Sequence, residues 1–162
     1  MAAPINAIRT MQAKDVVNAR LASAFVTVNG ERFLLFQAKT LEAKFEKSKS
    51  EVPILGRVSS GHKATGGNGT GSMTIYKNTS RFTKMMKDYK DTGSDIYFDM
   101  QITANDPTSD AGEETIILKD CNLDSVVVAA FDTSGDWLEQ EVDFTFEDWE
   151  MPTAYKDLDG MF

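Results

Sequence analysis

The chain has 162 residues, 41% of them apolar and 26% charged, which is the composition of one soluble globular domain and not of a disordered chain. Its net charge of −8 argues against a protein that wraps nucleic acid, because phosphate binding requires clustered Lys and Arg. No run approaches the roughly 18 apolar residues of a membrane helix. Met1–Thr10 lacks the pattern of a signal peptide, so we expect the chain to stay in the cytosol after synthesis.

The charges are sorted along the chain. Met1–Lys90 carries 15 Lys and Arg against 6 Asp and Glu, a net of +9, and Asp91–Phe162 carries 2 against 19, a net of −17. A molecule with a basic and an acidic part can attract copies of itself head to tail, which builds rings or filaments. The alternative is that the fold brings the two halves together, or that the charges lie on solvated faces.

The first predicted elements follow an arm at 1–22, which shows no clean hydrophobic period. Ala24–Val28 is predicted as a short strand, and Asn29-Gly30 after it is a strong hairpin signal. Glu31–Lys47 is predicted as one long strand. Its Phe33–Phe36 block is apolar on both faces, which indicates a bulge or a change of sheet midway.

Lys47–Gly71 is the most unusual segment. It holds six of the 11 glycines, and no clear secondary structure is predicted over its 25 residues. Loops of this length in a compact domain are mostly functional or disordered. We interpret it as a protruding loop that binds a partner and that is mobile or differently folded in a free subunit. Its basic candidates for the contact are Lys47, Lys49, Arg57, His62 and Lys63.

One helix is predicted next. A strand at Ser72–Lys77 leads to the cap Asn78-Thr79-Ser80, and apolar residues then recur at helical spacing until Gly93. That apolar stripe should pack against a sheet.

The rest of the chain is predicted to be strands. They cover 96–102, 115–118, 125–131 and 138–146. With about seven strands and one helix, the predicted fold is mainly β: two packed antiparallel sheets, a sandwich or open barrel, with one flanking α-helix and the long glycine-rich loop. We expect residues 1–162 to form a single domain.

The last strand carries an acidic face. Glu139, Glu141 and Asp143 alternate with Leu138, Val142, Phe144 and Phe146, and we assign Val142, Phe144 and Phe146 to the core. The acidic face must therefore meet water, a basic partner or a lumen. Inside a ring it would repel a polyanion and let it slide without sticking.

The sequence has few residues in patterns typical of catalysis, phosphate binding or metal binding. Gly56–Lys63 comes close to a phosphate-binding loop, but His62 stands at the lysine position and Ala64 replaces the hydroxyl that would meet Mg²⁺. One His and one Cys cannot form a zinc site alone, and Cys121 is expected near the core. We therefore expect no catalytic, cofactor-binding or metal-binding residues, and no enzyme.

An ordered set of segments resembles the tail tube proteins of contractile-tailed phages and of prophage-derived, phage-tail-like particles. The likeness covers roughly Val28–Asp148. Its segments are Glu51–Gly56, Gly61–Lys63, Gly69–Ser72, Thr79-Ser80, Lys84–Met86, Asp88-Tyr89, Tyr97–Asp99, Asn105–Ser109, Asn122–Ser125 and Asp143–Asp148.

The resemblance implies a structural role. Subunits would close into six-membered rings whose sheets join into one barrel around a lumen, and the rings would stack into the inner tube of a contractile tail, with the segment 47–71 reaching the neighbouring ring. The implied partners are further copies of the chain, a sheath protein, a baseplate hub and a tape-measure protein. DNA would be passing cargo, the subunit would not bind membranes, and it would reside in the tail of the particle. The alternative function is a small-ligand-binding β-barrel, which would stay monomeric.

Overall fold

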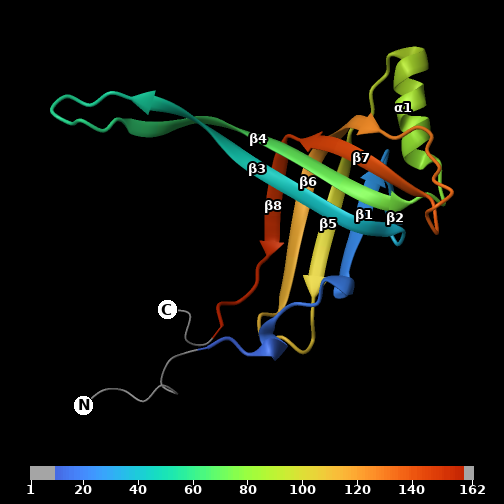
Figure 1. The fold of residues 1–162 in the computed structure, drawn as a ribbon, viewed down its shortest axis with the longest axis horizontal. Coiled ribbons are helices and arrows are strands. Elements are labelled where there is room, and N and C mark those ends of the chain that lie inside the picture. The colour runs from blue at the N-terminus through green and yellow to red at the C-terminus, as the bar shows by residue number, and fades with distance from the viewer. Residues whose placement is uncertain (1–9, 159–162) are drawn as a thin grey trace.

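The fold is a twisted antiparallel sheet in two crossing layers, flanked by one helix (Figure 1). The computed structural model describes residues 10–158. Its elements are the 3₁₀ turns Ala13–Asp15 and Ala19–Leu21, the strands β1 (Ala22–Val28), β2 (Glu31–Leu34), β3 (Ala38–Val52), β4 (Gly61–Tyr76), β5 (Phe98–Asn105), β6 (Glu113–Val126), β7 (Glu139–Phe146) and β8 (Asp148–Thr153), and the helix α1 (Arg81–Thr92). The predicted mainly β class is confirmed.

The eight strands are joined in one hydrogen-bonded path. Its order is β2-β1-β5-β6-β7-β4-β3, and β8 pairs with β6. β1, β2, β5, β8 and the first part of β6 form one layer, while β3, β4, β7 and the last part of β6 form the other. The two predicted sheets are thus two layers of one continuous sheet. The core between them contains side chains of both layers, among them Val26, Met100, Leu118, Met73, Val142 and Phe144.

β6 changes layer at a bulge. Asp120 has a φ of 54°, and its backbone N–H donates to Asp99 Oδ1 at 3.1 Å. On the neighbouring strand, Glu147 separates β7 from β8 and its N–H donates to the Lys119 carbonyl at 3.1 Å. Such bulges bend a strand and increase its twist. The two strands predicted at 115–118 and 125–131 are therefore wrong in extent: one strand runs through Cys121 and ends at Val126.

The first hairpin and the change of sheet are confirmed. Asn29 and Gly30 have φ values of 50° and 81°, as a two-residue turn between β1 and β2 requires. The predicted single strand at 31–47 is interrupted after Leu34, and β3 then begins at Ala38 in the other layer. The Phe33–Phe36 block contributes to the core on both sides of this interruption. Phe33, on β2, packs against the core, and Leu35, between β2 and β3, is buried in it.

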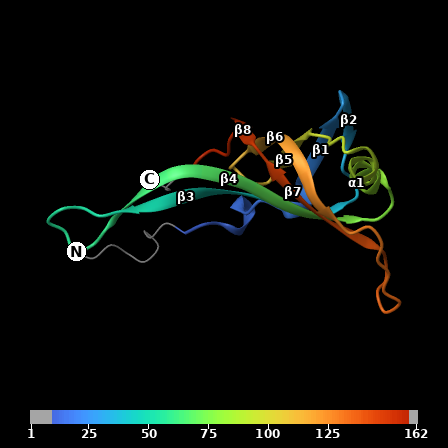
Figure 2. The same ribbon diagram turned by 90° about the horizontal axis from the view of Figure 1, so that it is seen from above.

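The prediction of an unstructured segment at Lys47–Gly71 was wrong. β3 and β4 remain paired from Leu41 with Met73 out to Val52 with Gly61, so only residues 53–60 lie outside strands. We call residues 47–63 the hairpin arm. It extends beyond the rest of the molecule, as Figure 1 and Figure 2 show.

The glycines of β4 are explained by packing against aromatic rings. A Cβ atom at Gly71 would overlap the Phe144 ring, one at Gly69 would overlap the Phe146 ring, and one at Gly67 would overlap the Phe45 ring. Glycine lets a ring lie flat over a neighbouring backbone at the cost of strand propensity. The run of glycines was therefore misread as flexibility.

The predicted helix is confirmed as α1. Phe82 and Met85 are buried against the sheet, and Gly93 ends the helix with a φ of 73°. The predicted cap is partly used: Thr79 Oγ1 accepts from the Arg81 N–H at 3.4 Å, whereas the Ser80 side chain makes no capping hydrogen bond. Tyr89, at the end of the predicted apolar stripe, is exposed.

The described part of the N-terminal arm is held by its own domain. The Asn18 N–H donates to Asp106 Oδ2 at 3.0 Å, and Ser109 Oγ donates to the Asp15 carbonyl at 3.0 Å. The rest of the predicted arm, residues 1–9, lies outside the described residues. At the other end, sequence analysis missed β8, whose residues are all exposed and show no burial alternation.

Candidate assembly surfaces

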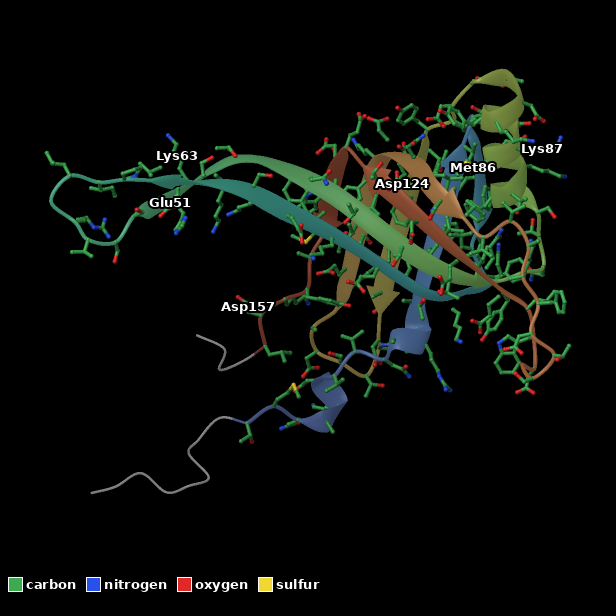
Figure 3. All side chains as sticks on the ribbon, turned by 45° about the horizontal axis from the view of Figure 1, so that its top comes forward. Glu51, Lys63, Met86, Lys87, Asp124 and Asp157 are labelled. Carbon is green, nitrogen blue, oxygen red and sulfur yellow. The ribbon has the colours of Figure 1, made fainter. Side chains whose placement is uncertain are left out.

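The hairpin arm carries all five basic candidates. Lys47 and Lys49 lie on β3, Arg57 lies at the tip, and His62 and Lys63 lie at the start of β4. Figure 3 shows Lys63 and Glu51 on the arm, away from the layers of the domain. None of its four Lys and Arg residues forms an ion pair with a residue in the range 10–158.

The tip of the arm is apolar as well as basic. Leu55 and Val58 are fully exposed, and Val52 and Ile54 are more than one-third exposed. Exposed apolar side chains gathered on a projecting element mark an interaction site. The arm therefore has the surface of an interface but no partner for it within the described subunit.

The acidic candidates share the face of β7 that points away from the core. Val142, Phe144 and Phe146 are buried as assigned, whereas Glu141 and Asp143 are exposed. Leu138, at the start of the alternation, is exposed, and the core position before Val142 is filled by Gln140, which is fully buried.

Gln140 can occupy the core because its side-chain amide donates hydrogen bonds to other groups of the subunit. Nε2 donates to Thr83 Oγ1 on α1 and to the Val127 carbonyl, both at 2.9 Å. These bonds tie the helix and the end of β6 to β7. A buried polar group is tolerated where such partners exist.

The three acidic residues differ in their surroundings. Glu139 Oε1 lies 2.7 Å from Lys39 Nζ and accepts from Trp137 Nε1 at 2.8 Å, and these hydrogen bonds lower the pKa of its carboxyl group. Asp143 Oδ2 accepts from Ser125 Oγ at 3.0 Å. The Glu141 carboxylate has no hydrogen-bond or ion-pair partner within 10–158. Glu141 and Asp143 are therefore the available charges of this face.

Hydroxyl side chains from β4 continue the acidic face. The register places Thr74 beside Glu141, Ser72 beside Asp143 and Thr70 beside Thr145. On β3, the same face continues through Thr40, Glu42 and Lys44. These β4 and β3 residues were not among the predicted lumen candidates, although the alternation of Thr70, Ser72 and Thr74 with Gly71 and Met73 was a signal. The outer face of this layer is polar and suited to water.

The same layer ends in two open edges. Within residues 10–158, β3 pairs with β4 on one side only, and β6 beyond Cys121 pairs with β7 on one side only. These strands therefore leave backbone N–H and C=O groups available to another chain.

The interior leaves little room for a ligand. The space between the layers is occupied by fully buried side chains, including Phe82, Phe144, Met73, Ile75 and Met100. Cys121 is also buried, which raises the pKa of its thiol to about 12. No group of three or more His, Cys, Asp or Glu residues within 10–158 could hold a metal ion. Among these residues, too, no helix has the length and apolar composition of a membrane span.

These surfaces define a class: a β-rich structural subunit that presents sheet edges and a projecting arm to other chains. The family model described as phage tail tube protein matches residues 9–153, and the chain belongs to this family. It is a family of structural proteins and not of enzymes.

The relatives agree with this assignment. The phage-like element PBSX protein XkdM of Bacillus subtilis (strain 168) is 46% identical over 138 residues, which span 81% of this chain and 94% of that protein. Two solved structures show the same fold at low identity. In the sheath-tube complex of an extracellular contractile injection system, PVC, the TM-score is 0.61 at 13% identity, covering 81% of this chain and 88% of that one. For the SPP1 tail tube the TM-score is 0.60 at 10% identity, covering 84% and 78%.

Proposed function

We propose that the chain is the inner-tube subunit of a contractile phage tail or phage-tail-like particle, and that six copies close into a ring around a lumen. Family membership supports the tube role, and the fold likeness to a sheath-tube complex supports the contractile setting. On this proposal residues 1–162 act as one tail-tube domain. The tail of the particle is its location, and sheath protein, baseplate hub and tape-measure protein are its neighbours.

The observation that carries the ring is the pair of open edges on one layer. If β3 of one copy pairs with the last part of β6 of the next, the layers join into a continuous barrel with no unpaired edge. The polar face with Glu141 and Asp143 would then line the lumen, while α1 and the other layer would face outward. A lumen wall of this charge would let DNA pass without binding it.

The hairpin arm is proposed as the element that joins successive rings. It projects from the layer that forms the barrel, its four Lys and Arg residues form no ion pair within residues 10–158, and Leu55 and Val58 at its tip are fully exposed.

Electron microscopy of the purified protein tests this function. Concentrated protein is expected to form hollow tubes or rings, and class averages of end views should show sixfold symmetry. A monodisperse monomer in sedimentation at all concentrations would contradict the proposal and would favour a ligand carrier. Rings with another symmetry would contradict only the number six.

A further inference from the structure

The hairpin arm requires a receiving surface with two properties. Residues 47–63 carry four Lys and Arg against Glu51, a net charge of 4 − 1 = +3 with His neutral. The tip adds the exposed side chains of Leu55 and Val58. A complementary surface must therefore be acidic and must offer apolar contacts.

One segment of the same chain has both properties. We call residues 128–138, which connect β6 to β7, the aromatic-acidic loop. Phe131 and Trp137 are 84% and 59% exposed, and they line an open recess of about 390 Å³ together with Asp132, Asp136 and Leu138. The chain contains no Lys or Arg between Lys119 and Lys156, so no cation of the loop itself weakens this charge.

The recess is held in shape by the subunit. Trp137 packs edge-on against Tyr76 with ring centroids 6.1 Å apart, and Lys77 Nζ donates to the Val128 carbonyl at 2.9 Å. Asp132 Oδ1 accepts from the backbone N–H and the hydroxyl of Ser134 at 2.9 and 2.6 Å, which fixes the turn. A preorganised surface loses little conformational entropy when it binds.

The two lysines near the aromatic-acidic loop do not pair with its aspartates. Lys39, on β3, is paired with Glu139, and Lys77 is bonded to the loop backbone. Asp136 has neither a hydrogen bond nor an ion pair within the described range. Its carboxylate is free for a cation from another molecule.

The arm and the recess lie at opposite ends of the layer. β4 begins beside the arm at Gly61 and ends at Tyr76, which contacts Trp137. Its 16 residues span about 50 Å at roughly 3.3 Å per residue. Figure 2 shows the arm and the loop pointing away from the domain at its two ends. An arm cannot reach the recess of its own subunit, so a contact between copies is head to tail, and contacts of this kind build rings or filaments.

We infer that the tip of the hairpin arm of one copy docks into the aromatic-acidic recess of a copy in the adjacent ring. Leu55 and Val58 contact Phe131 and Trp137, and the basic side chains of the arm approach Asp136. This inference rests on the proposed function, because it needs stacked rings.

Paired cysteines test the contact in assembled tubes. The variant Leu55→Cys with Phe131→Cys is expected to give a ladder of covalent multimers on a denaturing gel after mild oxidation. Neither single variant should give the ladder, because the contact joins two different positions. Native Cys121 can stay in place, since its thiol is buried.

A matched control uses another exposed aromatic position. Leu55→Cys with Tyr97→Cys should not cross-link, although Tyr97 is 53% exposed. If tubes form and the Leu55–Phe131 pair does not cross-link, the docking inference is overturned and the tube function stands. If the wild-type chain forms no tubes, both fail.

Charge reversal gives an independent readout. Asp136→Lys or Lys63→Glu alone is expected to raise the protein concentration needed for tube formation about tenfold, by placing like charges together. The double variant should restore assembly toward the wild-type concentration. Additive losses in the double variant would mean that the two side chains do not meet. Asp132 is left unchanged because it fixes the turn.

Discussion

Gly69 and Gly71 determine how closely β4 approaches the aromatic side of β7. The rings of Phe146 and Phe144 cover these two backbones, and both rings are buried in the core. Neither glycine has a positive φ, so glycine is required here only because a Cβ atom would not fit. A ring enclosed on all sides cannot move aside for an added methyl group.

Gly71→Ala should therefore destabilise the subunit. The added Cβ would overlap the Phe144 ring and would also lie 3.0 Å from the Glu42 carbonyl oxygen. We expect the free energy of unfolding to fall by about 1–3 kcal/mol, measured by urea denaturation. Gly66→Ala is the matched control on the same strand, because nothing lies within 4 Å of its added Cβ. Equal effects of the two substitutions would contradict the packing explanation.

At the scale of elements, the β3–β4 hairpin consists of two parts with different roles. Up to Phe45 and Gly69, β4 also pairs with β7, so this part belongs to the domain. Beyond that point the two strands pair only with each other. The outer part can be removed without exposing the core.

Excision of the outer hairpin tests its role in assembly. Residues 48–66 are replaced by Asn-Gly, which closes the Lys47–Gly67 pair with a two-residue turn. The shortened subunit is expected to keep its circular dichroism spectrum and unfolding midpoint but to form no long tubes. A control that keeps the hairpin length but carries Leu55→Ser and Val58→Ser separates loss of the apolar tip from loss of the strands. Long tubes from the shortened chain would show that rings stack through other surfaces.

At the scale of the whole molecule, the two layers divide the surface by chemistry. One layer turns a face of hydroxyl and acidic side chains outward, and the other layer and α1 cover its opposite side. On the proposed function, closure of the first layer into a barrel would place that polar face around the lumen. The proposed charge of the lumen then depends mainly on Glu141, Asp143 and the exposed Glu42 of β3, because Glu139 is paired with Lys39.

The double variant Glu141→Lys with Asp143→Lys tests whether these two residues line the lumen or lie in an interface between subunits. In a lumen, the variant should still assemble, and the tubes should retain short DNA duplexes that wild-type tubes release, measured by co-sedimentation at low salt. Retention should disappear as salt rises, because phosphate binding is electrostatic. If the two residues instead meet basic side chains of a neighbouring subunit, like charges would face each other and rings would fail to close. Assembled tubes that bind no more DNA than wild type would contradict the lumen position.

The sequence by itself determined the local features of this protein. The turn at Asn29-Gly30, the end of the helix at Gly93 and the burial of Val142, Phe144 and Phe146 all follow from preferences of a few neighbouring residues. The tail tube family was also predicted from an ordered set of segments, and the family match confirms it.

Only the tertiary structure decided what distant residues do to one another. The residues next to Gly69 and Gly71 in the sequence do not explain these two glycines. Their role appears only when the rings of β7, more than 70 positions later, lie over them. Gln140 occupies the core because Thr83 and Val127 reach its amide, and no local pattern contains these partners. The bulge at Asp120, which carries β6 from one layer to the other, likewise depends on the carboxylate of Asp99 in the next strand. Long-range pairing determines these features, because the free energy that stabilises them comes from contacts between strands and not from the preferences of single residues.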